Sequence, residues 1–599
     1  MSFNLAPFRR GTNQSYRPIP RNISPRPRLR LHWIGSRLPP LPLWIQRMIL
    51  PIKRLAGSLF ALSLFTLSLL VAPLLGGDLQ MKLRSQQETK PDSGLYHPQT
   101  HDERWKPEQT AIIVCDMWDL HTCQNAVLRG QEFAPRLNDL LKQARDQGVT
   151  IIHAPSGCMA NYAEHPARLR AEQTPKAGDI PADINQWCHQ IPAEENGVYP
   201  VDQADGGNDD DAQQRAAWKA SLTAQKRNPA RPWIKQTDLL PIDPARDYIS
   251  DQGDEVWSIL AARNIDNVIL TGVHTNMCVL GRPFGLRQLA KNGKNVVLMR
   301  DLTDTMYNPA SWPYVNHFTG TDLIVSHIEK HVCPTVSSNQ ILGGEEFAFA
   351  ADTRPHVVMV MAEGEYETAQ TLPQFGGDFL GRDFRVSYLY GSETDPNDIP
   401  GLEKALATAD VLLISVRRRA LPPEQMEALK KYVAAGKPMV GIRTASHAFG
   451  LRGKQPPAGT KTWEEFDQEV WGGNYSNHYA NNLKSTIETV EANQKHPILR
   501  GVSREPFTQN GSLYQAAPLA AGATTLLTGT VAGKPAEPVA WTFRRADGGW
   551  SFYTSLGHKV EFQQRAFQRL LLNSIYWAAG LEVPAHFDLN KPTPPQRKS

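Results

Sequence analysis

The chain has 599 residues, which at roughly 100–200 residues per domain favours two sizeable domains. Its formal net charge is +4, and 21% of its residues are charged. The positive excess lies at the N-terminus, because residues 1–77 contain no Asp or Glu. The remainder is slightly acidic, which argues against nucleic acid as a partner.

The cysteines fit neither a zinc-finger spacing nor a dense disulfide framework. There are six: Cys115, Cys123, Cys158, Cys188, Cys278 and Cys333. For Cys115 and Cys333 we expect small buried residues. Cys278 is the one whose surroundings point to chemistry.

The N-terminus has the pattern of an exported protein. Residues 1–54 are basic and rich in Pro and Arg, and we expect them to be disordered. Lys53 and Arg54 then precede an uncharged apolar stretch, 55–77, near the ~20 residues that span a bilayer. We interpret 55–77 as a signal peptide or a transmembrane anchor, with Met48 as an alternative start. The rest of the chain is then periplasmic or extracellular, or anchored and facing outward.

Alternating strands and helices begin after a polar segment, 78–107, that we interpret as a linker. Residues 110–118 and 149–155 are predicted strands, and 133–148 is a predicted helix that stops at Gly148. Residues 173–230 hold "DGGNDDD" and few apolar runs, and we interpret them as an insertion. The alternation resumes with these elements: helix 254–264, strand 267–272, helix 277–293 and strand 295–299.

A second α/β series follows another predicted linker, 343–354. Its expected elements are strands 356–362, 385–391, 409–416 and 438–444, helix 423–436, strand 550–558 and helix 565–580. We therefore expect two three-layer α/β/α domains with largely parallel sheets, at 108–342 and 355–584, before a disordered tail at 585–599.

Cys278 lies just after an apolar strand, where a helix is expected to begin. Backbone N–H groups and the helix dipole at such a point stabilise negative charge, and we expect them to lower the thiol pKa. Asp116, at the end of the first strand, is a candidate base. Lys235 is a candidate for stabilising the thiolate. Strand ends meet at one edge of a parallel sheet, so these residues can converge.

The segments "VCDMWD", "WIKQ" and "GVHTNMCV" resemble the isochorismatase-like cysteine hydrolases, which include nicotinamidases and N-carbamoylsarcosine amidohydrolases. The resemblance implies a catalytic triad of Asp116, Lys235 and Cys278. It also implies a cis peptide bond between Val273 and His274, with the His274 and Cys278 amides as an oxyanion hole. A small-molecule amide would be cleaved at its C–N bond through a thioester.

Two further polar residues, Asp119 and His121, are candidates for substrate binding, with a solvated turn as the alternative. Nicotinamidases bind zinc through a closely spaced Asp and His, but no clear counterpart follows the second strand. We therefore predict no metal and no cofactor for this region.

From residue 355 onward, "GIRTASHAF", "GGNYSNHY" and "FYTSLGH" resemble the ThuA-like (trehalose utilisation) domain, with its flavodoxin-like, class I glutamine amidotransferase-like fold. No cysteine follows Cys333, so thiol chemistry is excluded here. Five residues form a candidate polar site for a sugar or a metal, or serve structural roles: Glu363, Tyr366, His447, His478 and His558.

Three hypotheses remain open. The first is an amidohydrolase acting through Cys278. The alternative is a carbohydrate-binding or carbohydrate-processing protein whose function resides in the ThuA-like region. A third is a two-step enzyme, in which fusion raises the effective concentration of one site's product at the other. Both families often form oligomers, and the sequence leaves the oligomeric state open.

Overall fold

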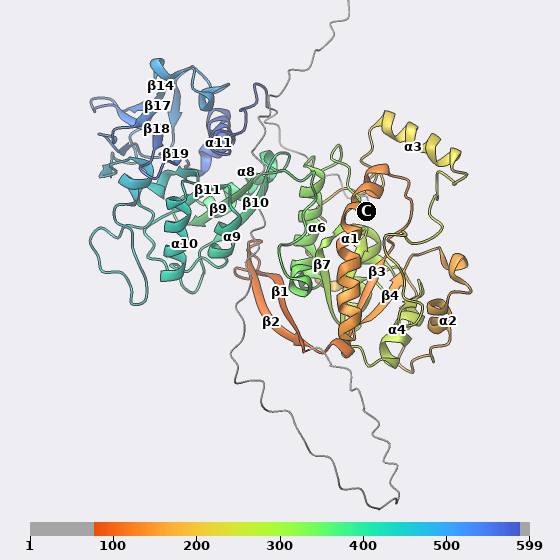
Figure 1. The fold of residues 1–599 in the computed structure, drawn as a ribbon. Coiled ribbons are helices and arrows are strands. Elements are labelled where there is room, and N and C mark those ends of the chain that lie inside the picture. Colours follow the sequence, from red (N-terminus) through yellow and green to blue (C-terminus); the bar gives the residue numbers. More distant parts are fainter. Residues whose placement is uncertain (1–76, 588–599) are drawn as a thin grey trace, which may run out of the picture. The chain divides into compact units, whose positions relative to one another are not determined.

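A computed structural model describes residues 77–587 (Figure 1). The first half holds an eight-stranded mixed sheet in the order β2-β1-β8-β7-β6-β3-β4-β5. Strands β3 to β8 run parallel, whereas β1 pairs antiparallel with β2 and β8. The strands are β1 (Leu79–Glu88), β2 (Tyr96–Trp105), β3 (Thr110–Cys115), β4 (Thr150–Ala154), β5 (Tyr248–Ile249), β6 (Asn267–Val273), β7 (Asn295–Asp304) and β8 (Thr335–Val336).

Both faces of this sheet are covered, as alternation along β3 shows. Ala111 and Ile113 pack into the core formed with α4, α5 and α6, whereas Ile112 and Val114 pack into the core formed with α1. The helices are α1 (Gln124–Gln147), α2 (Pro166–Glu172), α3 (Ala212–Ala224), α4 (Gly253–Ala262), α5 (Leu286–Lys291), α6 (His317–His331) and α7 (Asn339–Leu342).

The segment expected to be a linker, 78–107, is instead the antiparallel pair β1 and β2. The reason is visible in the alternation at the start of β1, where Leu79, Met81 and Leu83 are buried and the residues between them are exposed. This apolar face adds to the core that also contains Trp105.

Leu83→Ala is expected to lower the free energy of unfolding by about 2–5 kcal/mol, because the Leu83 side chain is fully buried. Denaturant titration of the full chain measures this change. The exposed Thr100→Ala on β2 is the matched control, expected to change stability by less than about 0.5 kcal/mol. Equal stability of the two variants would show that β1 adds nothing to the core.

The second half holds a nine-stranded sheet in the order β10-β9-β11-β12-β19-β18-β17-β14-β15, and β13 pairs with β16 apart from it. The first five strands in this order run parallel to one another. The last four, β18, β17, β14 and β15, each pair antiparallel with the strand before them. The strands are β9 (His356–Ala362), β10 (Arg385–Tyr390), β11 (Val411–Val416), β12 (Met439–Ile442), β13 (Asn477–His478), β14 (Ser485–Thr489), β15 (Phe507–Gln509), β16 (Tyr514–Gln515), β17 (Ala523–Thr530), β18 (Glu537–Arg544) and β19 (Trp550–Thr554).

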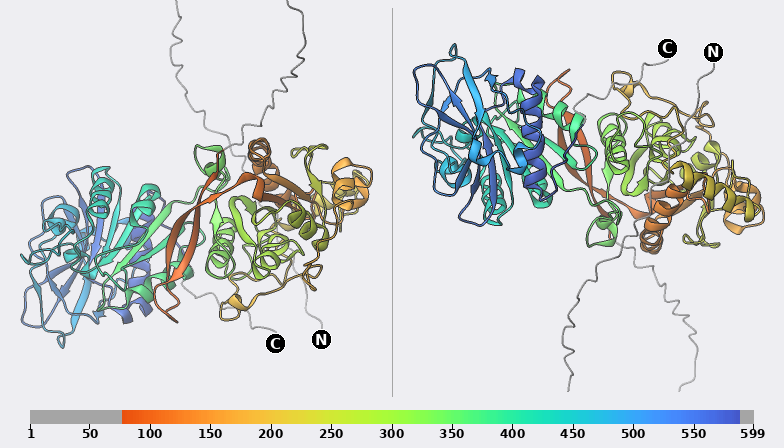
Figure 2. Two further views of the ribbon diagram at one scale, coloured as in Figure 1. Left: turned by 90° about the horizontal axis from the view of Figure 1, so that it is seen from below. Right: turned by 90° about the horizontal axis from the view of Figure 1, so that it is seen from above.

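Helices cover the second sheet as well. They are α8 (Thr368–Phe379), α9 (Leu402–Thr408), α10 (Pro423–Ala434) and α11 (Arg565–Ala578). Helix α11, blue in Figure 2, packs against β12 and β19. Along β9, Val357 and Met359 face the core that includes α8 and α11, whereas Val358 and Val360 face α9 and α10. The predicted fold class, α/β with largely parallel sheets, is confirmed.

The prediction of a transmembrane protein is corrected by the structure. Within residues 77–587, no helix is both long and apolar enough to cross a membrane. The predicted disordered segment 1–54, the predicted signal peptide or anchor 55–77 up to residue 76, and the predicted tail 585–599 from residue 588 lie outside the described residues.

Candidate active site

Cys278 lies one turn beyond strand β6, in a short π-helix at Thr275–Val279. The single helix expected at 277–293 is interrupted: Pro283 separates this turn from α5, because proline lacks the N–H that a continuous helix needs. Cys278 is 8% exposed, and its side chain lines a cavity. The thiol is therefore within reach of a ligand rather than sealed in the core.

Asp116 directly follows β3, the neighbour of β6 in the sheet, and is fully buried. The Asp116 carboxylate lies close enough to the Cys278 thiol to raise the pKa of that thiol. The chain enters β4 on one side of β3 and β6 on the other, so the pair lies at the switch point where α/β sheets form their ligand crevice. Asp116 also has a φ of 49°, a left-handed conformation that is costly for a residue with a Cβ.

Arg282, not Lys235, supplies the positive charge beside this pair. The Arg282 Nε and a terminal nitrogen each lie 3.0 Å from Asp116 Oδ2, and the Ser156 amide donates to Oδ1 at 2.7 Å. The Lys235 Nζ instead contacts the exposed Asp238 at 2.7 Å. The structure thus brings Asp116 and Cys278 together, places Arg282 beside them, and leaves Lys235 paired with Asp238.

The charges of this cluster oppose the expectation of a thiol with a lowered pKa. Burial, and then the Asp116 carboxylate, raise the pKa of Cys278. Burial also raises the pKa of Asp116, while the Arg282 charge and the hydrogen bonds from Cys278 and Ser156 lower it. The resting thiol is therefore protonated, and the Arg282 charge favours the ionised form of the Asp116 carboxylate beside it.

The predicted cis peptide bond between Val273 and His274 is present. The His274 backbone amide acts to lower the pKa of the Cys278 thiol. The His274 side chain is buried, with its ring centroid 4.8 Å from that of His121. One of the two amides expected in an oxyanion hole therefore lies close to the Cys278 sulfur.

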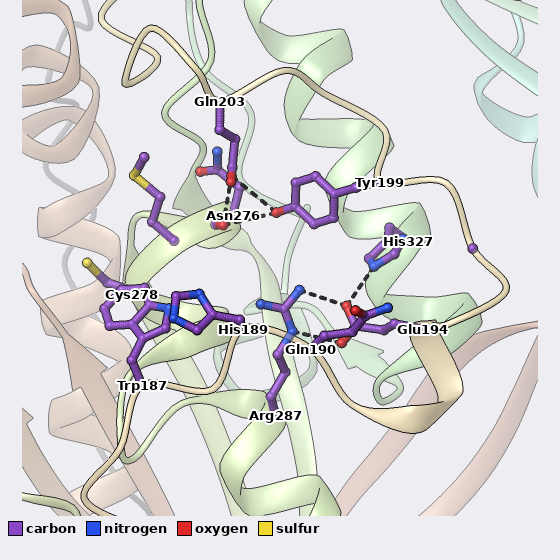
Figure 3. Close-up of a pocket in the computed structure, with 12 residues that line it drawn as sticks. Trp187, His189, Gln190, Glu194, Tyr199, Gln203, Asn276, Cys278, Arg287 and His327 are labelled. Atoms are coloured by element: carbon purple, nitrogen blue, oxygen red, sulfur yellow. Dashed lines mark hydrogen bonds and ion pairs between the residues drawn. The ribbon is translucent and has the colours of Figure 1, made fainter. Parts of the chain in front are cut away.

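The cavity beside Cys278 has a volume of about 540 Å³ and is shown in Figure 3. Most of its lining comes from the predicted insertion, 173–230, which supplies Trp187, His189, Gln190, Glu194, Gly197, Tyr199 and Gln203. Trp187 packs over Gly281 so closely that a Cβ there would lie 2.5 Å from the indole. The Arg282 guanidinium also stacks on Trp187, 5.3 Å from the ring centroid.

A buried ion cluster forms the wall opposite the thiol (Figure 3). Arg287 donates to both carboxylate oxygens of Glu194, at 2.7 and 2.8 Å, and His327 Nε2 lies 2.8 Å from the same carboxylate. Although burial acts to raise the pKa of Glu194, the hydrogen bonds from His327 and Arg287 lower it to about 2. Glu194 is therefore a fixed carboxylate that anchors the 173–230 segment to α5 and α6.

Asp119 and His121 have structural partners. Asp119 accepts hydrogen bonds from Arg227 at 2.7 Å and from the Ile234 amide at 3.2 Å, and so fixes the end of the insertion. The His121 ring lies nearly parallel to those of Trp118 and Trp233, at 5.9 and 5.8 Å, and the two indoles stack on each other at 4.6 Å. His121 also lines a second, smaller cavity with Asp116 and His274, and burial lowers its pKa to about 4, so the imidazole is neutral.

The acidic "DGGNDDD" loop has a local role. Asp210 accepts from the Gln124 and Asn125 amides at 2.8 and 2.9 Å and so caps helix α1. Asp209 forms two hydrogen bonds to Arg129, whose Nε also donates to Asp304. With Cys123 these carboxylates bring three potential metal ligands within 4.8 Å of one another, but they already pair with protein donors.

The candidate polar site of the second half is only partly assembled. Tyr366, His447 and His478 line a common cavity of about 400 Å³. Glu363 does not line it: its carboxylate accepts from three backbone amides and the Thr368 hydroxyl at the start of α8. His558 caps a helical turn at Lys559–Gln563 and only touches Tyr366 edge-on.

Comparison with known proteins divides the chain in the same way. The family model described as trehalose utilisation (ThuA) matches residues 388–578. No curated protein matches the sequence. A ThuA-like protein from Bacteroides uniformis is 17% identical; the match covers 39% of this chain and 95% of that one, with a TM-score of 0.30.

Other solved structures are similar to this chain at the same low level of identity. A cysteine hydrolase from Pseudomonas syringae pv. phaseolicola is 16% identical over 39% of this chain and 92% of its own, with a TM-score of 0.24. N-carbamoylsarcosine amidase from Thermoplasma acidophilum is 11% identical over 39% and 97%, with a TM-score of 0.21. The chain thus resembles ThuA proteins and isochorismatase-type hydrolases.

Proposed function

We propose that the first half of this protein is a cysteine hydrolase that cleaves the C–N bond of a small amide. The observation that carries this proposal is the pair of Cys278 and Asp116, which follow adjacent strands at the switch point of the sheet, with Cys278 lining a cavity. Arg282, rather than Lys235, completes the pair.

In the proposed mechanism, Asp116 takes the proton of Cys278 as the sulfur attacks the carbonyl carbon. The carbonyl oxygen becomes an oxyanion, which the His274 and Cys278 amides stabilise. Asp116 then returns the proton to the leaving amine, and the C–N bond breaks to give a thioester. Water, deprotonated by Asp116, hydrolyses the thioester to a carboxylic acid and frees the thiol.

The thioester gives the proposal its test. A panel of small primary and N-substituted amides is incubated with the full chain, and the reaction is quenched with acid. We expect one amide to leave its acyl mass on the peptide that contains Cys278 in mass spectrometry, with one equivalent of amine released. Steady turnover of an amide with no adduct and no effect of iodoacetamide would contradict the proposal.

A further inference from the structure

The ThuA-like half has a cavity of its own, built on the second sheet. Its walls come from the segments that follow three adjacent parallel strands, β9, β11 and β12. Because the chain enters β10 on one side of β9 and β11 on the other, this cavity also lies at a switch point. Its lining residues are Glu365, Tyr366, Arg417, Arg418, His447, Arg452, Tyr475, His478, Asn481 and Tyr514.

The charge of this cavity is strongly positive. Three arginines, Arg417, Arg418 and Arg452, line it, against the single carboxylate of Glu365, which pairs with Arg417 at 2.8 Å. The Arg417 Nε is buried and has no hydrogen-bond partner among the described residues. Arg418 donates to the Gly450 carbonyl at 3.4 Å, and Arg452 is exposed. The buried Arg417 Nε is thus the donor left without an acceptor among the described residues of this cavity, which is costly unless a ligand supplies one.

Aromatic rings form the rest of the wall. Tyr475 stacks on His447, with ring centroids 4.5 Å apart, and lies 4.6 Å from Tyr514. Behind them the fully buried Arg443 is held between the rings of Tyr366 and Tyr514, at 4.4 and 4.7 Å. Such surfaces pack against the flat faces of polar rings while their hydroxyl groups form hydrogen bonds.

The backbone around this cavity is strained. Nine non-glycine residues of the described chain have positive φ, and four of them belong to these segments: Glu367, Arg418, Arg443 and Arg452, with φ between 46° and 57°. Such conformations are rare for residues with a Cβ and gather where a ligand is clamped. Arg443 and Arg418 follow β12 and β11 almost directly, so the strain lies at the strand ends that face the cavity.

We propose that this cavity binds a small anionic sugar, with Arg417, Arg418 and Arg452 holding its carboxylate or phosphate and Tyr475 and Tyr514 packing on its ring. Burial and then the Arg418, Arg417 and Arg452 charges lower the pKa of His447 to about 2, so the imidazole stays neutral beside the anion. The same positive field disfavours a metal ion. This inference is independent of the proposed hydrolase site.

Isothermal titration of the full chain with glucose 6-phosphate, glucuronate and glucose tests the proposal. We expect at least one anionic sugar to bind ten-fold or more tightly than glucose, and this preference to shrink as salt is raised. Preference for glucose 6-phosphate identifies a phosphate ligand, and preference for glucuronate a carboxylate ligand; either supports the proposal. Equal affinity for all three sugars, or saturable binding of none, overturns it.

Matched variants locate the binding. The double variant Arg417→Gln with Arg452→Gln should weaken the anionic sugar ten-fold or more, and Tyr475→Ala should weaken it independently. Arg504→Gln, an exposed charge in the same half, is the control and should leave affinity unchanged. Thermal unfolding verifies that each variant is folded. Unchanged affinity in both pocket variants overturns the proposal, whereas Cys278→Ala is expected to bind as wild type, whatever becomes of the hydrolase.

Discussion

Cys278→Ala is expected to lower kcat/KM for an amide substrate by about 10⁴-fold or more, because no other group in the cavity can form the thioester. The cavity is otherwise lined by the Glu194 cluster, aromatic rings and amides, which can bind a substrate but not replace the nucleophile. Substrate should therefore still bind, and KM should change far less than kcat. Steady-state kinetics on purified full-length protein separates the two constants.

Cys333→Ala is the matched control. Cys333 is also 8% exposed and packs in the same core, yet it lines none of the cavities described above. Its removal should alter stability but leave kcat/KM within about two-fold. If Cys278→Ala keeps wild-type turnover while Cys333→Ala does too, the chemistry lies elsewhere in the chain.

Replacement of Arg282 is the second change that we expect to lower kcat/KM strongly. Arg282→Gln is expected to reduce kcat/KM by about 10²–10³-fold, because it removes the charge that holds Asp116 ionised in a buried site. The pKa of Asp116 is already raised by burial, and loss of Arg282 raises it further. Since Asp116 acts as a base, the acidic limb of the pH–rate profile should move to higher pH in this variant.

Lys235→Gln also removes one positive charge, and it distinguishes Lys235 from Arg282 as the residue that keeps Asp116 ionised. Its Nζ contacts Asp238 on the surface, so we expect kcat/KM within about two-fold of wild type and an unmoved acidic limb. The pH–rate profiles of both variants, measured side by side, decide the matter. A large loss in Lys235→Gln with little change in Arg282→Gln would restore the assignment made from sequence.

The pairing of Asp116 with Cys278 could be predicted because each directly follows a buried strand, and strand ends of a parallel sheet converge. The proposed role of Arg282 is not among the predictions from sequence, although its spacing from Cys278 indicates it. Arg282 lies four residues after Cys278, about one helical turn away, and so on the same side of the chain. The sequence favours Lys235 instead, because an expected position at the edge of the sheet and the family motif both point to it.

Other elements of the fold are not predicted from the sequence, because their residue pattern is weak or depends on distant residues. Strand β1 buries only Leu79, Met81 and Leu83, and a short alternation followed by polar residues is easily taken for a linker. Strands β14 and β15 are short, and β17 pairs with β18 through register shifts; none of these four antiparallel strands is predicted from the sequence. Residues 173–230 owe their conformation to distant partners, such as Glu194 to Arg287, which no local pattern reveals.

In the proposed hydrolase, the residues that react and the residues that select the substrate lie in separate segments of the chain. The reacting sulfur and its carboxylate sit on the framework of the first sheet, whereas seven residues that a substrate would meet come from one irregular excursion between β4 and β5. Replacing the segment between β4 and β5 would change which substrate binds and leave Cys278 and Asp116 in place. Proteins with this scaffold can therefore change their substrate specificity and keep the same reaction mechanism.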